Sequence, residues 1–440
     1  MENRAELALK YFRENETWMN DRIESGIEAN RKGWAKLRFV DSNGEPVTNV
    51  QLKMEQKTHD FRFGCNLFML DELETEEKNQ KFKEMYPKLF NLATLPFYWA
   101  NLEPEPGKLR FAKDSPKNYR RPAPDLCLEF CKEHNIEPKT HILTYDYWVP
   151  KWVPTDDVDE IKGLYEIRYK QLADRYAQQI KGWEVINETL FTHGDTAFYY
   201  DDNYVEWCFE KAEEYFPNNT LIINEATESA WSRFIGNRSQ YFMQIERAIA
   251  NGSRIDCIGF QYHQFHKREL EEEKTKFTYN PLNLYANMDK YAQFQKHFQL
   301  TELTIPAYSN DEEDEAIQAE ILTWLYKVWF SHPNMEAIIY WNLIDGYAAF
   351  APKGDMTAGE NYYFGGLLRF DGSPKPSYFA IRDLFKKTWH TRFEGKTNGD
   401  GRVNLRGFYG EYDVTVEVDG KVYSVKADLH KGRNKLKIEL

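Results

Sequence analysis

Short apolar runs alternate with amphipathic stretches from about residue 61 to about residue 385, and this alternation limits the folds that the chain can adopt. The runs have the length of buried strands, and the stretches between them, such as 161–180 and 312–331, have helical periodicity. Eight runs are candidate strands: 61–66, 89–94, 139–144, 182–187, 220–224, 257–261, 298–301 and 337–341. Eight strand–helix repeats predict an α/β fold, a (β/α)8 or TIM barrel of parallel strands.

An open, doubly wound sheet is the alternative arrangement of alternating strands and helices. Such a sheet favours a glycine-rich first turn of the form G-x-G-x-x-G, and the chain has no such segment. The barrel is therefore the preferred prediction, and it takes up residues 61–390.

Both ends of the chain have a different character from the barrel region. Residues 1–34 are charged with periodic apolar positions, which predicts an exposed helical segment. Residues 35–60 alternate around the turn at 41–44 and predict a β-hairpin. Residues 391–440 carry turn signals at 398–401 and 419–420 between alternating runs, which is typical of a small antiparallel β module. Because neither piece is a stable sheet alone, we expect the hairpin to pair with this module.

Composition narrows the classes of partner and compartment. The net charge is −13, which disfavours binding to nucleic acid or to anionic membranes, whereas a neutral polar ligand such as a carbohydrate is compatible. The N-terminal residues lack the basic and apolar regions of a signal peptide, and no run has membrane-spanning length, so a cytoplasmic protein is expected. The five cysteines are an odd number in apolar patterns, which predicts reduced, buried thiols.

Two of the predicted strands end on a glutamate. The string WEVINE ends at Glu188 and the string LTEL contains Glu302. A carboxylate at the tip of a buried strand is costly unless a site needs it, although a helix N-terminus could also explain Glu188 and an ion pair could explain Glu302. In a barrel, strand ends face one another, and paired carboxylates across a pocket are typical of glycoside hydrolysis.

Further polar and aromatic side chains follow the predicted strands at the same rim. A sugar has polar edges and apolar faces, so this mixture suits a carbohydrate site. The candidates for substrate binding or orientation are His141, Tyr145, Asn187, Gln261, His263 and Trp341. His263 and His266 are spaced as a possible ligand pair, but no third ligand is evident, so neither a metal nor a cofactor is predicted.

The ordered set of strand-end motifs resembles glycoside hydrolase family 10, whose best-known members are endo-β-1,4-xylanases. The resemblance extends over most of residues 60–385 and is carried by motifs in the family's order. They are HILTY at 141–145, WEVINE at 183–188, GFQYH at 259–263, TEL at 301–303, WNLID at 341–345 and PKPSY at 374–378.

This resemblance implies a retaining double displacement on β-1,4-xylan or xylo-oligosaccharides. Glu302 would be the nucleophile and Glu188 the acid/base. His263 would orient Glu302, and Asn187 would contact the sugar 2-hydroxyl. Gln261 and His141 would hold other hydroxyls or the carboxylates, and Trp341 and Tyr145 would form apolar walls.

One segment departs from the family pattern. After the second predicted strand the family carries Glu-Asn and a lysine that grip the sugars on the non-reducing side, whereas this chain has Phe97, Tyr98 and Trp99. Asp146 also stands where the family often has histidine. These changes leave open an exo-acting β-glucosidase or β-xylosidase, and more remotely a non-catalytic sugar-binding barrel. The sugar, the linkage and the oligomeric state are not determined by the sequence.

Overall fold

Eight parallel strands close into a barrel in the computed structural model of the protein, which describes residues 3–232, 236–432 and 435–440. The strands follow one another around the barrel in chain order, and the last pairs with the first. They are β3 (Arg62–Asn66), β4 (Leu92–Pro96), β5 (Glu137–His141), β6 (Gly182–Asn187), β7 (Thr220–Glu225), β8 (Cys257–His263), β9 (His297–Thr304) and β10 (Met335–Tyr340). The predicted (β/α)8 barrel is confirmed.

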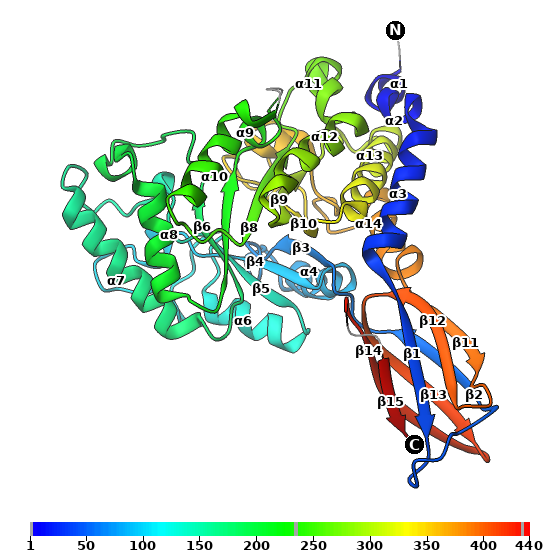
Figure 1. The fold of residues 1–440 in the computed structure, drawn as a ribbon. Helices are drawn as coiled ribbons and strands as arrows, with labels where there is room; N and C mark the ends of the chain where they lie inside the picture. The colour runs from blue at the N-terminus through cyan, green and yellow to red at the C-terminus, as the bar shows by residue number, and fades with distance from the viewer. Residues whose placement is uncertain (1–2, 233–235, 433–434) are drawn as a thin grey trace.

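Helices surround this barrel, as Figure 1 shows. The two helical stretches singled out by periodicity are α7 (Val158–Tyr176) and α13 (Glu312–Ser331). The other helices of this part of the chain are α4 (Glu76–Leu89), α5 (Trp99–Leu102), α6 (Pro124–Glu133), α8 (Tyr204–Tyr215), α9 (Thr227–Ala230), α10 (Gln240–Ala250), α11 (Glu271–Thr278), α12 (Pro281–Tyr291) and α14 (Pro376–Asp383). Single turns are η1 (Asp146–Trp148), η2 (Ala197–Tyr200), η3 (Gly236–Arg238), η4 (Arg268–Leu270), η5 (Ala292–Phe294), η6 (Gly359–Tyr363) and η7 (Leu384–Thr388).

Two predicted strands are displaced along the chain. The run 89–94 begins inside α4, whose last residue is Leu89, and the strand itself starts at Leu92. The run 139–144 overshoots, because the regular ladder ends at His141 and Thr144 returns only as an isolated bridge to Ile186. Apolar content alone does not mark where a buried helix end becomes a strand.

The N-terminal segment is helical but is not simply exposed. It forms α1 (Arg4–Ala8), α2 (Lys10–Glu14) and α3 (Glu16–Arg31), and α3 runs beside α13 on the outside of the barrel (Figure 1). Leu9, Phe12 and Met19 are buried in the main core. The periodic apolar positions therefore cover α13, which explains why that barrel helix is buried on nearly every side.

Strands from both ends of the chain build a separate β module beside the barrel (Figure 1). One sheet has the order β12-β1-β15 and the other β11-β2-β13-β14. The strands are β1 (Lys32–Val40), β2 (Gln51–Gln56), β11 (Arg392–Lys396), β12 (Arg402–Phe408), β13 (Gly410–Val418), β14 (Lys421–Leu429) and β15 (Lys435–Glu439). The expected union of the N-terminal strands with the C-terminal tail is confirmed, and one of its pairs, β1 with β15, is parallel.

The predicted 35–60 hairpin is wrong, because β1 and β2 lie in different sheets. Each strand turns its apolar side into one shared core that contains Leu37, Leu52 and Val414. Burying both apolar sides against each other requires two facing sheets and not a two-stranded ribbon. The turn at 398–401 likewise joins two sheets, whereas Asp419-Gly420 closes the predicted β13–β14 hairpin. The division of the chain at residues 34, 60 and 390 remains a prediction.

The fold also determines the surroundings of the cysteines and the apolar character of the helices. All five cysteines are free and buried, as expected from their apolar surroundings. Within the described ranges, no helix has both the length and the apolar character needed to cross a bilayer.

Candidate active site

A cavity of about 470 Å³ opens at the carboxyl ends of the barrel strands. It is lined by all eight residues that the sequence singled out: His141, Tyr145, Asn187, Glu188, Gln261, His263, Glu302 and Trp341. A larger hollow of about 980 Å³ lies where the opposite end of the barrel meets the β module, and its lining includes Glu55, His59 and Phe385. Barrel enzymes place their chemistry at the carboxyl ends of the strands, so the smaller cavity is the candidate active site.

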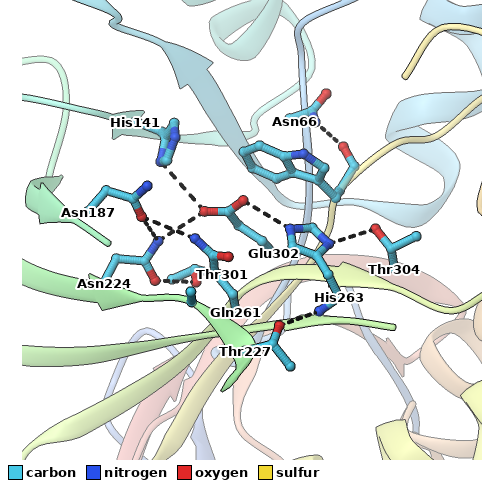
Figure 2. A network of polar contacts seen from close by, with 12 residues as sticks. Asn66, His141, Asn187, Asn224, Thr227, Gln261, His263, Thr301, Glu302 and Thr304 are labelled. Carbon is cyan, nitrogen blue, oxygen red and sulfur yellow. Dashed lines mark hydrogen bonds and ion pairs between the residues drawn. The ribbon is translucent and has the colours of Figure 1, made fainter. Parts of the chain in front are cut away.

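Glu302 lies within β9 at the floor of this cavity and is only 4% exposed. Its Oε1 accepts a hydrogen bond of 3.0 Å from Asn224 Nδ2, and its Oε2 lies 3.2 Å from His263 Nε2 (Figure 2). Burial raises the pKa of Glu302 to about 8; the charge of Glu188 acts in the same direction and that of His141 opposes it. The site therefore holds the Glu302 carboxyl in an environment that resists its ionisation.

Glu188 directly follows β6 and has a left-handed backbone, with φ of 53°. Its Oε1 accepts a 2.8 Å hydrogen bond from Gln261 Nε2, and its Oε2 accepts one of 2.5 Å from the Tyr145 hydroxyl. The turn after it is held by Glu225, whose carboxylate accepts from the backbone N–H of Thr189 at 2.9 Å. A non-glycine residue in this conformation persists only where its surroundings hold it, and Glu225 supplies that restraint.

Three buried amides connect the two carboxylates. Asn224 Nδ2 donates to Asn187 Oδ1 at 2.8 Å as well as to Glu302. Gln261 Nε2 donates to the same Asn187 oxygen at 3.2 Å and to Glu188. Figure 2 shows Asn187, Asn224 and Gln261 grouped beside Glu302. The chain of donors and acceptors brings Glu188 and Glu302, which are distant in the sequence, to one pocket.

A hydroxyl at 301 orients the central amide. Thr301 Oγ1 donates to Asn224 Oδ1 at 2.5 Å, so the Asn224 oxygen faces Thr301 and its Nδ2 faces Glu302. Neither Thr301 nor Asn224 is among the site residues predicted from the sequence. Asn224 ends a predicted strand, and that position was the only signal in the sequence that could have included it.

His263 lies between Glu302 and Thr304. Its Nδ1 is 3.0 Å from Thr304 Oγ1, and burial lowers the pKa of the imidazole, which favours the neutral ring. A neutral imidazole has one N–H. With the Thr304 hydroxyl donating to Nδ1, that N–H lies on Nε2 and donates to Glu302.

A buried charged pair lies beneath His141. Glu184 hydrogen-bonds both His141 Nδ1 and the Lys139 ammonium. Burial opposes ionisation of Glu184, but the charges of Lys139 and His141 outweigh it and hold the pKa of Glu184 below its usual range. His141 Nδ1 is also 3.9 Å from Glu302 Oε1, so Glu184 and Lys139 help to position a ring at the floor of the cavity. Charged residues inside two predicted apolar strands were the sequence signal for it.

Aromatic side chains form the wall of the cavity on the β4 and β10 side. Trp341 lies edge to face with His141, at a centroid distance of 5.4 Å, and with Phe68 at 5.2 Å. Tyr98 completes the cluster and is buried in it. Tyr145 lies near its edge and is occupied by its bond to Glu188.

The sequence missed several lining residues because they come from loops. His193 Nε2 is 3.6 Å from Glu188 Oε2, and its Nδ1 is 3.0 Å from Asp146 Oδ1. Arg120 and Arg121 enter from the long segment between α5 and α6. Loop residues carry no periodicity, so the pattern that locates strand ends does not locate them. Across the described residues, no group of three or more His, Cys, Asp or Glu side chains could hold a metal ion.

A parallel barrel with two carboxylates joined across an aromatic cavity is the architecture of a glycoside hydrolase. Comparison with known families specifies the type. The family model described as Glycosyl hydrolase family 10 matches residues 67–384, and the chain belongs to this family.

Individual relatives are distant in sequence. The chain is 23% identical to the anti-sigma-I factor RsgI6 of Acetivibrio thermocellus over 428 residues, covering 94% of this chain and 49% of that protein. It is 24% identical to endo-1,4-beta-xylanase B of Thermotoga neapolitana over 343 residues, covering 74% of this chain and 88% of the xylanase. Thus the chain spans about half of the first relative and most of the second.

Solved structures show the same fold. Xylanase 10B from Thermotoga petrophila RKU-1, in complex with xylobiose, superposes with a TM-score of 0.58 at 22% identity and covers 75% of this chain and 95% of the xylanase. The family match leaves out residues 1–66 and 385–440, which include the N-terminal helices and the strands of the β module.

Proposed function

We propose that the protein is a retaining β-glycosidase that cleaves β-1,4-xylan or xylo-oligosaccharides. The observation that carries the proposal is the donor chain through Gln261, Asn187 and Asn224, which places Glu188 and Glu302 at one cavity. Family membership supports glycoside hydrolysis, and the named xylanase relatives support xylan as the first substrate to test.

The proposed reaction has two displacements. In the first, Glu302 reacts in its ionised form: a carboxylate oxygen bonds to the anomeric carbon while the glycosidic C–O bond breaks, and protonated Glu188 transfers its proton to the departing oxygen. In the second, Glu188 takes a proton from water, the water oxygen bonds to the anomeric carbon, and Glu302 leaves as a carboxylate. Each displacement inverts the configuration of the anomeric carbon, so the overall reaction retains it.

The surrounding contacts support these roles. Asn224 and His263 donate to Glu302, which stabilises its charge when it leaves the glycosyl-enzyme. Tyr145 and Gln261 bond the two oxygens of Glu188 and hold it toward the cavity. Asn187, whose oxygen accepts from Asn224 and Gln261, would turn its Nδ2 to the sugar 2-hydroxyl.

The stereochemistry of the products tests the retaining proposal. Proton NMR of xylo-oligosaccharide hydrolysis in its first minutes should show the β-anomer before mutarotation produces the α-anomer. Initial release of the α-anomer would contradict the double displacement while leaving glycoside hydrolysis in place.

An exo-acting enzyme is the second candidate, because aromatic packing occupies the place of the family's polar glycone grip. Tyr98 is buried and lies 5.3 Å, centroid to centroid, from Trp148 on η1. Products from a ladder of xylo-oligosaccharides separate the two modes. We expect a spread of internal cleavage products; accumulation of xylose alone from the start would instead establish exo action.

Burial of Glu302 also predicts a change in stability. Its pKa of about 8 lies above the value of 4.5 for an ordinary glutamate, so between these pH values the folded protein keeps a proton that the unfolded chain has released. Stability from this group is therefore full at low pH and is lost as the pH rises toward 8. Glu302→Gln should stabilise the protein little at pH 4.5 and by about 2–4 kcal/mol at pH 8.

Urea unfolding of both proteins across pH 4.5 to 8 measures this difference. Glu210→Gln, on the exposed side of α8, removes a comparable charge without burial and serves as the control. Stability curves for Glu302→Gln and the original protein that run parallel across this range would contradict the prediction.

A further inference from the structure

Two consecutive arginines, Arg120 and Arg121, line the cavity and are almost fully buried. Arg120 is 6% exposed and Arg121 is 8% exposed. Arg120 has a left-handed backbone, with φ of 61°, in the segment between α5 and α6. A charged side chain is rarely buried unless it is paired.

Neither guanidinium is paired. Among the residues that the structure describes, no Asp or Glu oxygen lies within ion-pair distance of Arg120 or Arg121, whereas buried Arg4 pairs with Glu271 and Asp314. Glu360 lines the same cavity, where burial raises the pKa of its carboxyl and the charge of Arg120 opposes that rise. The two arginines therefore bring positive charge to the cavity that no direct ion pair neutralises among the described residues.

Hydrogen bonds satisfy these arginines only in part. Arg120 Nη1 donates to the Tyr347 carbonyl and, at 3.3 Å, to Asn342 Oδ1, and its buried Nε has no partner. Arg121 donates from Nε to Asn101 Oδ1 at 3.2 Å and from Nη1 to the Arg120 carbonyl at 2.8 Å. Of the described acceptors, none bonds Nη2 of either residue. By contrast, buried Arg168 donates to three backbone carbonyls, as a structural arginine does.

Arg121 packs on the ring of Tyr98, which lies beside His141 at the floor of the cavity. The Arg121 guanidinium carbon is 4.0 Å from the centroid of the Tyr98 ring. Tyr98 lies 5.1 Å, centroid to centroid, from His141, whose Nδ1 is 3.9 Å from Glu302 Oε1.

We propose that Arg120 and Arg121 bind an anionic group, the carboxylate of a uronic acid residue, in the cavity that Glu188 and Glu302 line. A planar guanidinium presents parallel N–H donors that match the two oxygens of a carboxylate. The inference rests on the proposed function, since it names the glycan class taken by the same cavity. A sulfate ester on the sugar shares the anionic chemistry and is distinguished below.

Binding to inactive protein tests the proposal without relying on turnover. Calorimetric titration of Glu302→Gln would compare a xylo-oligosaccharide bearing glucuronic acid with its methyl ester, which lacks the charge and carries one additional methyl group. We expect the acid to bind about 10- to 100-fold more tightly, because hydrogen bonds to charged groups have this magnitude. Equal binding of acid and ester would overturn the proposal.

Variants locate the effect at the arginines. In the Glu302→Gln background, Arg120→Gln and, separately, Arg121→Gln should remove most of the preference for the acid while binding of the ester changes less than about 3-fold. Lys117→Gln, an exposed charge on the same segment, is the matched control and should keep the preference. Circular dichroism establishes that each variant is folded, and Arg120→Lys keeps the charge if Arg120→Gln does not fold. A preference that survives in both arginine variants would place the anion elsewhere and contradict the proposal.

Further measurements distinguish a carboxylate from a sulfate as the anion, and they test the anion site separately from the proposed function. A sulfated oligosaccharide that binds more tightly than the uronic acid would overturn the carboxylate assignment and identify a sulfate site. Hydrolysis of neutral xylan by the original protein, together with equal binding of acid and ester, refutes the anion site and leaves the proposed function standing. A retained, arginine-dependent preference without hydrolysis of any β-glycoside supports the anion site and refutes the proposed function.

Discussion

Glu302→Ala is expected to lower kcat on xylo-oligosaccharides by about 10⁴-fold or more, because it removes the atom that forms the covalent intermediate. Glu302 is the more buried of the two glutamates proposed for the chemistry, and Asn224 and His263 each orient one of its oxygens. Water in the vacated space lacks both the position and the nucleophilicity of the carboxylate. Initial rates on an aryl β-xyloside and on xylotetraose measure the loss.

The product that Glu302→Ala forms with azide tests the role of Glu302 more directly than the loss of rate does. In the space left by the shortened side chain, azide should bond to the anomeric carbon on the face that Glu302 attacks, which yields the α-glycosyl azide from an activated aryl β-glycoside. The Glu210→Gln control should show neither the loss nor the azide product. Turnover by Glu302→Ala near the original rate would refute the assignment of the nucleophile.

Glu188→Ala is expected to slow the cleavage of substrates whose leaving group needs a proton more than the cleavage of substrates whose leaving group does not. Loss of the general acid should lower the rate on xylo-oligosaccharides by about 10²- to 10⁴-fold. An aryl glycoside whose phenolate departs without protonation should still form the glycosyl-enzyme, so a burst of phenolate should precede slow turnover. Stopped-flow absorbance at the wavelength of the phenolate measures both phases.

The azide product distinguishes this variant from the first. Azide needs no base, and it should attack the glycosyl-enzyme on the face opposite Glu302 to yield the β-glycosyl azide. Opposite anomers from Glu188→Ala and Glu302→Ala would therefore assign the two roles independently of rate. Interchanged anomers would mean that the roles of the two carboxylates are reversed.

Strand ends were predictable because a parallel barrel imposes a simple rule on them. Apolar runs mark the strands, their last residues meet at one rim, and a carboxylate there stands out against its apolar neighbours. This rule predicts Glu188, Glu302, His141 and Gln261 as site residues, and all four line the cavity. The catalytic roles assigned to them remain predictions.

Pairing of the terminal strands was only partly predictable. Alternation at 35–40 and 50–54 correctly indicates strands, and the turn at 41–44 suggested that they pair with each other. The observed partners are more than 300 residues away for both strands, as in the pairs Leu37–Val403 and Leu52–Val416. Partner choice depended on burying two apolar faces together, which local alternation does not encode.

By itself the sequence determined the number and order of the barrel strands, the family motifs at their ends and the identity of the two proposed catalytic carboxylates, because each depends on local periodicity and residue type. Only the tertiary structure decided which distant strands share a sheet, how three amides connect Glu188 to Glu302, and that Arg120 and Arg121 enter the cavity with no ion pair to a described carboxylate. These features depend on the burial of groups that are far apart in the chain, and the energy of a buried charge or amide is set by its neighbours in space.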